Sequence, residues 1–153
     1  MDLFSESRNL SGLEMLRKMM AEGRGPPIAA TLQFTLAEVE RGRAVFRAIP
    51  GPHASNPIGV VHGGYAATLL DSACGCAVHS TLEAGQAYTT LELKVAYHRA
   101  ITNDTGPIEA VGTVVTGGRR VAFAEARLVD SKGRLLASAT STLLVFETPP
   151  ERS

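Results

Sequence analysis

The segment spanning residues 63–80 constrains the fold more than any other part of the chain. Between His62 and His79 it holds a single charged residue, Asp71, among Ala, Leu, Cys, Gly, Val and small hydroxyl residues. A helix that is apolar on nearly every side is normally buried on nearly every side. Its many small side chains would let a sheet approach the helix backbone closely. The segment therefore predicts a central, buried helix.

Strand-like segments lie on both sides of this helix in the sequence. They are rich in β-branched residues and are separated by turn signals such as Thr102-Asn103-Asp104. Short turns favour antiparallel pairing, because parallel pairing needs long crossovers. We therefore predict an α+β fold in which an antiparallel sheet wraps around one long helix. The predicted strands cover residues 32–39, 44–49, 88–97, 108–116, 121–130 and 135–146.

The ends of the chain carry their own signals. Apolar residues recur at helical spacing over residues 9–22, and Gly23 ends that pattern, so an additional N-terminal helix is predicted. Gly25-Pro26-Pro27 then breaks the chain and leads into an extended stretch. We expect a flexible tail over residues 147–153. The whole chain, residues 1–153, is predicted to be one domain with its core at about residues 30–146.

Composition excludes several partners. Fifteen basic and fifteen acidic residues cancel, so the chain has no general attraction for nucleic acid or anionic membranes. No apolar run approaches the ~20 residues that cross a bilayer, and the N-terminus has no secretory pattern. On a helix, Cys74 and Cys76 project about 200° apart, which rules out a disulfide between them. The expected location is the cytoplasm.

The start of the central helix can polarise a carbonyl group. Two glycines, Gly63 and Gly64, leave unsatisfied backbone N–H groups exposed at the positive end of the helix dipole. Such donors stabilise an oxyanion. Asp71 lies eight residues after Gly63, roughly 12 Å further along the helix axis. One chain therefore cannot hold both against one carbonyl, but a symmetric dimer can place Asp71 of one subunit opposite Gly63 of the other.

Asp71 itself allows two interpretations. It is either a core aspartate bonded to neutral donors, or a general base or nucleophile toward an acyl carbon. No basic residue lies within a helical turn of Asp71, and it is too far into the helix to cap its N-terminus. We favour the functional interpretation, because an isolated carboxylate in an apolar setting carries a penalty of several kcal/mol.

The sequence from Asn56 through Pro-Ile-Gly-Val-Val to His62-Gly63-Gly64, followed after six residues by Asp71, resembles the signature of hotdog acyl-CoA thioesterases of the phenylacetate-degradation (PaaI-type) family. The resemblance implies a hotdog fold and an acyl-CoA substrate. It implies that Asp71 is the catalytic carboxylate, as base or nucleophile, and that the Gly63 N–H polarises the thioester carbonyl. It also implies that His62 and Asn56 shape the site.

The resemblance assigns further residues. It implies that Thr90 faces the carboxylate across the subunit interface, and that coenzyme A lies near the turn Gly117-Gly118-Arg119-Arg120. Each has a simpler interpretation: Thr90 as a plain strand residue, His62 as a helix cap, and the arginines as a solvated turn. Tyr65, Ala66, Leu69 and Phe123 are candidates for the acyl pocket. The predicted substrate- and CoA-binding residues are Gly64, Tyr65, Gly118, Arg119 and Arg120.

Hydrolysis of an acyl- or aroyl-CoA thioester is thus the leading hypothesis. No metal and no cofactor are expected, since CoA is part of the substrate. One alternative is a hotdog hydratase or dehydratase, but Asp71 is not followed five residues later by a His, because position 76 is Cys. Another is a non-catalytic acyl-CoA-binding module, and an acyl-carrier protein remains open as the thioester donor. The open edge of the predicted sheet favours a homodimer, and fold relatives also form tetramers.

Overall fold

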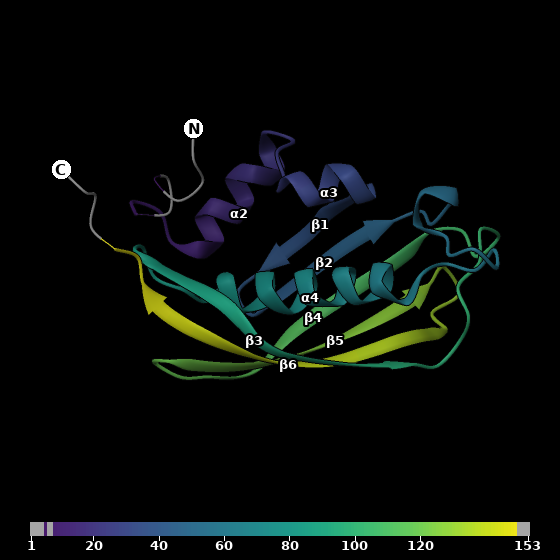
Figure 1. Ribbon diagram of the computed structural model, residues 1–153. Helices are drawn as coiled ribbons and strands as arrows, with labels where there is room; N and C mark the ends of the chain where they lie inside the picture. The colour runs from purple at the N-terminus through teal and green to yellow at the C-terminus, as the bar shows by residue number, and fades with distance from the viewer. Residues whose placement is uncertain (1–4, 6–7, 150–153) are drawn as a thin grey trace.

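The computed structural model describes residue 5 and residues 8–149. Two helices open the chain, followed by two strands, a short 3-10 helix, one long helix and four further strands (Figure 1). Their bounds are α2 Gly12–Ala21, α3 Pro27–Leu32, β1 Phe34–Glu40, β2 Arg43–Ala48, η1 Pro52–Ala54, α4 Gly63–His79, β3 Gln86–Tyr97, β4 Ile108–Gly117, β5 Val121–Asp130 and β6 Leu135–Glu147.

The six strands form one antiparallel sheet that curves around α4 (Figure 1). The strand order is β1-β2-β4-β5-β6-β3, so β1 and β3 are the edges. Helices α2 and α3 lie beside β1, on the side of α4 away from the middle of the sheet (Figure 1). This arrangement confirms the predicted fold: an antiparallel sheet wrapped around one long helix, with an additional N-terminal helix.

The central helix matches its prediction almost residue for residue. It begins at Gly63, with His62 as N-cap, and ends at His79. The buried side chains of α4 include Leu69, Leu70, Ala66, Ala73 and Cys74. They belong to one hydrophobic cluster that also takes buried side chains from β1, β2, β4, β5 and β6, and partly buried side chains of β3 pack against it. Because α4 carries Gly63, Gly64 and Asp71, its burial fixes the positions of these residues of the candidate site.

The helix backbone rests directly on the sheet at Gly112 of β4. A Cβ atom at this position would overlap the carbonyl group of Ala73 and approach the backbone nitrogen of Cys74. The helix and the sheet come this close because both surfaces consist of small residues at this point. The sequence had indicated such a close approach from the helix side alone.

We expect Gly112→Ala to lower the free energy of unfolding by about 1–3 kcal/mol or more, because the added methyl group must push α4 away from the sheet. Denaturant unfolding measures this change. Gly117→Ala on the same strand is the matched control, since nothing lies within 4 Å of a Cβ atom there. Equal stability of the two variants would contradict the packing described here.

The N-terminal region departs from the prediction at one point. Helix α2 falls within the expected 9–22 and begins at a capping box, in which the Ser11 side chain accepts from the Glu14 backbone and Glu14 accepts from the Ser11 backbone. The stretch predicted as extended after Gly25 instead forms α3, which starts at Pro27. Proline fixes a helical φ and needs no N–H acceptor, so it is well suited to the first position of a helix.

The remaining expectations concern the ends and the cysteines. Strand β6 continues to Glu147, one residue into the predicted tail, and residues 150–153 lie outside the described part of the chain. Cys74 and Cys76 are both free thiols. Within residues 8–149, no helix is long and apolar enough to cross a membrane.

Candidate active site

Asp71 is held by a neighbouring strand of its own chain. The hydroxyl of Thr90, on β3, donates a hydrogen bond of 2.9 Å to Asp71 Oδ1. Both side chains are half-buried. Thr90 had been expected to face the carboxylate across a subunit interface. That expectation is wrong, because β3 lies along α4 and the same chain supplies both Thr90 and Asp71. A β-bulge between Thr90 and Glu92 locally shifts the register of β3 against β6.

No cationic side chain pairs with Asp71 among the residues that the structure describes. Its second oxygen, Oδ2, accepts no hydrogen bond from that part of the chain. Burial, followed by the negative charge of Asp71, raises the pKa of the Cys76 thiol to about 12. Cys76 is therefore a neutral thiol at physiological pH and not a thiolate nucleophile.

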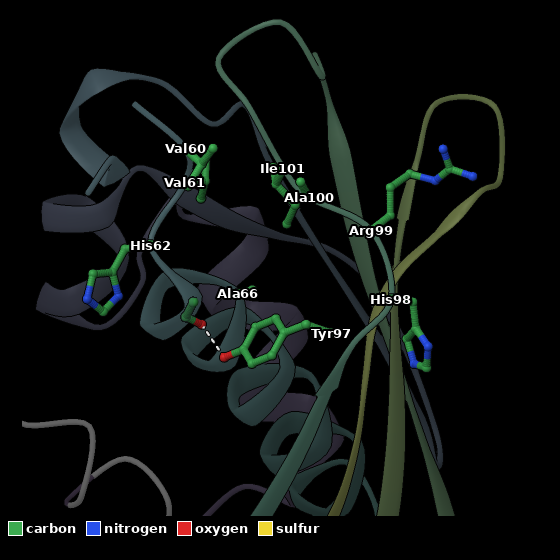
Figure 2. Close-up of a pocket in the computed structure, with 10 residues that line it drawn as sticks. Val60, Val61, His62, Ala66, Tyr97, His98, Arg99, Ala100 and Ile101 are labelled. Atoms are coloured by element: carbon green, nitrogen blue, oxygen red, sulfur yellow. Dashed lines mark hydrogen bonds between the residues drawn. The ribbon is translucent and has the colours of Figure 1, made fainter. Parts of the chain in front are cut away.

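The first turn of α4 is held from two sides. The N–H of Gly64 donates to His62 Nδ1 at 2.8 Å, so His62 caps the helix. On the other side, the Tyr97 hydroxyl donates to the Gly63 carbonyl oxygen at 2.7 Å (Figure 2). The Gly63 N–H, as the first in the helix, has no acceptor within the helix. His62 and Tyr97 thus fix the backbone around an available N–H donor.

A cavity of about 260 Å³ opens beside this turn (Figure 2). Tyr97 extends from β3 toward the helix, whereas the side chain of Arg99 points away from it (Figure 2). Arg99 and His98 are exposed and follow directly after β3. The lining residues are Val60, Val61, His62, Gly63, Ala66, Tyr97, His98, Arg99, Ala100 and Ile101.

The other residues of the predicted site are not all near this turn. Asn56 is half-buried, and its Oδ1 accepts a hydrogen bond of 3.1 Å from the N–H of Ile58. This bond stabilises the local turn before α4. Arg119 and Arg120 are exposed on the turn between β4 and β5, together with Gly118. That turn lies at the opposite end of the molecule from the first residue of α4 (Figure 1). One chain therefore does not bring the arginines to Gly63.

The candidates for the acyl pocket are mostly core residues. Tyr65 and Leu69 are 4% and 1% exposed, and Phe123 is exposed on β5. Ala66 lines the small cavity beside Gly63. None of the four lines a second cavity, which measures about 810 Å³ and lies between α2, α3, β1 and α4. The contact of these four residues with an acyl group stays a prediction.

Sequence reasoning missed two residues of β3 that approach α4, Tyr88 and Tyr97, and the last residue of α4, His79. Tyr88 lies over Gly75, where a Cβ atom would come within 2.5 Å of the Tyr88 hydroxyl oxygen. A glycine in the middle of a helix was therefore an available signal of close approach. The ring of Tyr88 also lies 5.7 Å from that of His79, centroid to centroid.

Solved structures share this architecture. A thioesterase family protein of Silicibacter pomeroyi matches at 26% identity and a TM-score of 0.76, over 94% of this chain and 98% of its own. A conserved protein of Pseudomonas aeruginosa matches at 28% identity and a TM-score of 0.75, over 82% and 98%. A hypothetical thioesterase of Streptococcus pneumoniae, solved with coenzyme A, matches at 26% identity and a TM-score of 0.69, over 76% and 91%. No curated protein sequence gives a significant match.

The fold is thus that of the hotdog thioesterases. The thioesterase superfamily model matches residues 58–137, which include the first turn of α4, Asp71 and Thr90. The chain belongs to the thioesterase superfamily, and it is a thioester hydrolase.

Proposed function

We propose that this protein hydrolyses acyl-CoA or aroyl-CoA thioesters to the free acid and CoA, at a site shared between two subunits. The observation that carries the proposal is the hydrogen bond from Thr90 to Asp71, which orients a carboxylate that has no cationic partner among the described residues. A carboxylate with one oxygen bonded and one open can accept a proton from water or attack an acyl carbon.

The chemistry needs a donor for the developing oxyanion. Attack on the thioester carbon, by water deprotonated at Asp71 or by Asp71 itself, turns the carbonyl oxygen into an oxyanion. The Gly63 N–H is the donor proposed for it, at the positive end of the α4 dipole. When the tetrahedral intermediate collapses, the C–S bond breaks. On the general-base route the proton taken up by Asp71 passes to the sulfur, so the free acid and the CoA thiol leave together. On the nucleophilic route CoA leaves as a thiolate that takes its proton from water, and a water molecule then hydrolyses the acyl–Asp71 anhydride to the free acid. His62 and Asn56 support the backbone that presents Gly63.

A second subunit is proposed to complete the site. Within one chain, Gly63 and Asp71 are eight residues apart on a straight helix, roughly 12 Å along its axis. Strand β3 is a twelve-residue edge strand that pairs, among the described strands, with β6 alone, and Leu91 on it is 57% exposed. Long open edges are the surfaces through which sheets pair. A two-fold homodimer through β3 would bring Asp71 and Thr90 of one subunit toward the partner's first helical turn.

Coenzyme A is the proposed carrier of the acyl group. The Streptococcus pneumoniae relative was solved with coenzyme A and is 26% identical to this chain. CoA is multiply anionic, and a neutral chain must bind it with local cations. Arg99 beside the small cavity, and Arg119 and Arg120 of a partner, are the proposed contacts. Arg119 and Arg120 belong to the turn that the family resemblance assigns to CoA. They reach the first turn of α4 only if a dimer brings the two ends of the molecule together.

The proposal is tested by thiol release from a panel of acyl-CoAs, with acyl-carrier-protein thioesters as the alternative carrier. We expect Thr90→Val to lower kcat about 10- to 100-fold with little change in KM, because it removes a hydrogen bond to a charged group. Thr90→Ser keeps the donor and should stay close to the parent protein. If Thr90→Val keeps activity within twofold of the parent, the role of Thr90 in orienting Asp71 is contradicted. If no thioester releases thiol, the proposed thioester hydrolysis is contradicted.

A further inference from the structure

The cavity of about 810 Å³ under the N-terminal helices is large enough for a small-molecule group, since such sites measure about 300–1,000 Å³. Helices α2 and α3 cover it, strands β1 and β2 form its wall, and α4 and β3 border it. Its apolar lining includes Leu16, Phe34, Phe46 and three methionines, Met15, Met19 and Met20, whose flexible side chains adapt to what they contact.

The cavity begins beside the catalytic pair. Ser72, which directly follows Asp71, lines it. Tyr88 also lines it and precedes Thr90 by two residues, so both side chains project from the same face of β3. An acyl group whose thioester carbon lies at Asp71 therefore has an apolar space directly within reach.

One wall of this apolar space carries polar groups that make no hydrogen bond to the described part of the chain. His79 is 8% exposed and lines the cavity, yet neither of its ring nitrogens has a hydrogen-bond partner among the described residues. The neighbouring Tyr88 hydroxyl also makes no hydrogen bond within the described residues. Buried polar groups are nearly always paired, and leaving one unpaired is costly. A buried imidazole with two unpaired nitrogens, beside the Tyr88 hydroxyl in the wall of a largely apolar cavity, indicates a polar feature in what fills it.

Both groups are neutral at physiological pH. Burial lowers the pKa of His79, so one imidazole nitrogen donates and the other accepts. Burial is also the main cause that raises the pKa of the Tyr88 phenol, ahead of Cys76 and Asp71, so this hydroxyl keeps its proton. Together they form an uncharged site that suits a hydroxyl or carbonyl oxygen.

We infer that this cavity binds the acyl group of the substrate, and that His79 and Tyr88 select acyl chains with a hydroxyl or oxo group near their far end. The inference rests on the proposed function, because it takes the thioester carbon to lie at Asp71. His79 comes eight residues after Asp71, roughly 12 Å along α4. An extended chain advances about 3.5 Å per three bonds, so the oxygen lies about ten bonds from the thioester carbonyl carbon.

The test compares 10-hydroxydecanoyl-CoA with decanoyl-CoA, which lacks only the terminal hydroxyl group. We expect kcat/KM to favour the hydroxylated substrate about 10- to 100-fold, since the unsubstituted chain leaves His79 and Tyr88 unpaired. His79→Leu should reduce that ratio to about 1 while decanoyl-CoA turnover is kept or improved, because it replaces an unpaired polar group with an apolar one. Tyr88→Phe should reduce the ratio in part.

His53→Leu is the matched control, because His53 is exposed and does not line the cavity. It should keep the preference of the parent protein. Equal kcat/KM for the two substrates in the parent protein, or an unchanged ratio in His79→Leu, would overturn the inference while leaving thioester hydrolysis intact. If neither substrate nor any other thioester is hydrolysed, the proposed function itself fails. Should His79→Leu not fold, the parent ratio and the Tyr88→Phe ratio decide the question.

Discussion

Asp71→Asn is expected to lower kcat for thioester hydrolysis about 10²- to 10⁴-fold, the contribution typical of a general base. Asparagine keeps the shape and can still accept the Thr90 hydrogen bond at its amide oxygen, but it neither takes a proton from water nor attacks an acyl carbon. Substrate binding should change little. The rate is measured by thiol release at saturating acyl-CoA, with KM determined in the same series.

The control for this variant is Asp104→Asn, the same chemical change on an exposed loop. It should retain the activity of the parent protein. Circular dichroism and a thermal melt establish that Asp71→Asn is folded. Activity of Asp71→Asn within tenfold of the parent would show that the carboxylate is a core residue bonded to a neutral donor, which is the simpler interpretation of the sequence.

Gly63→Pro should lower kcat about 10²- to 10³-fold, because it deletes the N–H donor proposed for the oxyanion. Proline suits the first position of a helix, and His62 before it has the extended ψ of 135° that a residue preceding proline adopts. The helix can therefore keep its start while losing one donor. Gly63→Ala is the control, since its Cβ meets Tyr97 in the same way but the N–H remains.

The same two variants test the shared site. In a mixed dimer of Asp71→Asn and Gly63→Pro subunits, one of the two sites contains an intact Asp71 and an intact Gly63. Random reassociation makes half of the dimers mixed, so the mixture should recover about a quarter of the parent activity. A mixture with no more activity than the separate variants would show that each chain works alone, and would remove the dimer from the proposed mechanism.

The sequence predicted those features that depend on local pattern. Asp71 stands out because it is the single acid of an apolar helix, and the strands after it follow from β-branched residues between turns. Helix α3 was missed because Pro26-Pro27 signals a break as readily as a helix start. His79 and Tyr88 were missed because their meeting depends on how α4 lies against β3, a long-range arrangement that single-sequence patterns do not encode.

Thr90 illustrates the same limit within the site. Its residue type and approximate place were implied by the family signature, but whether it serves its own carboxylate or that of another subunit depends on the register of β3. The β-bulge next to Thr90 changes which side chains face the helix. No periodicity in residues 88–97 reveals this bulge, so only the three-dimensional structure places the hydroxyl.

Strand β3 bonds to α4 at two points, through Thr90 to Asp71 and through Tyr97 to the Gly63 carbonyl group. In the proposed two-fold homodimer, each half-site is therefore set within its own chain before the subunits meet. Assembly then brings two finished half-sites together without rearranging the reacting groups. On this proposal, the activity per chain rises with protein concentration as the fraction of dimer rises.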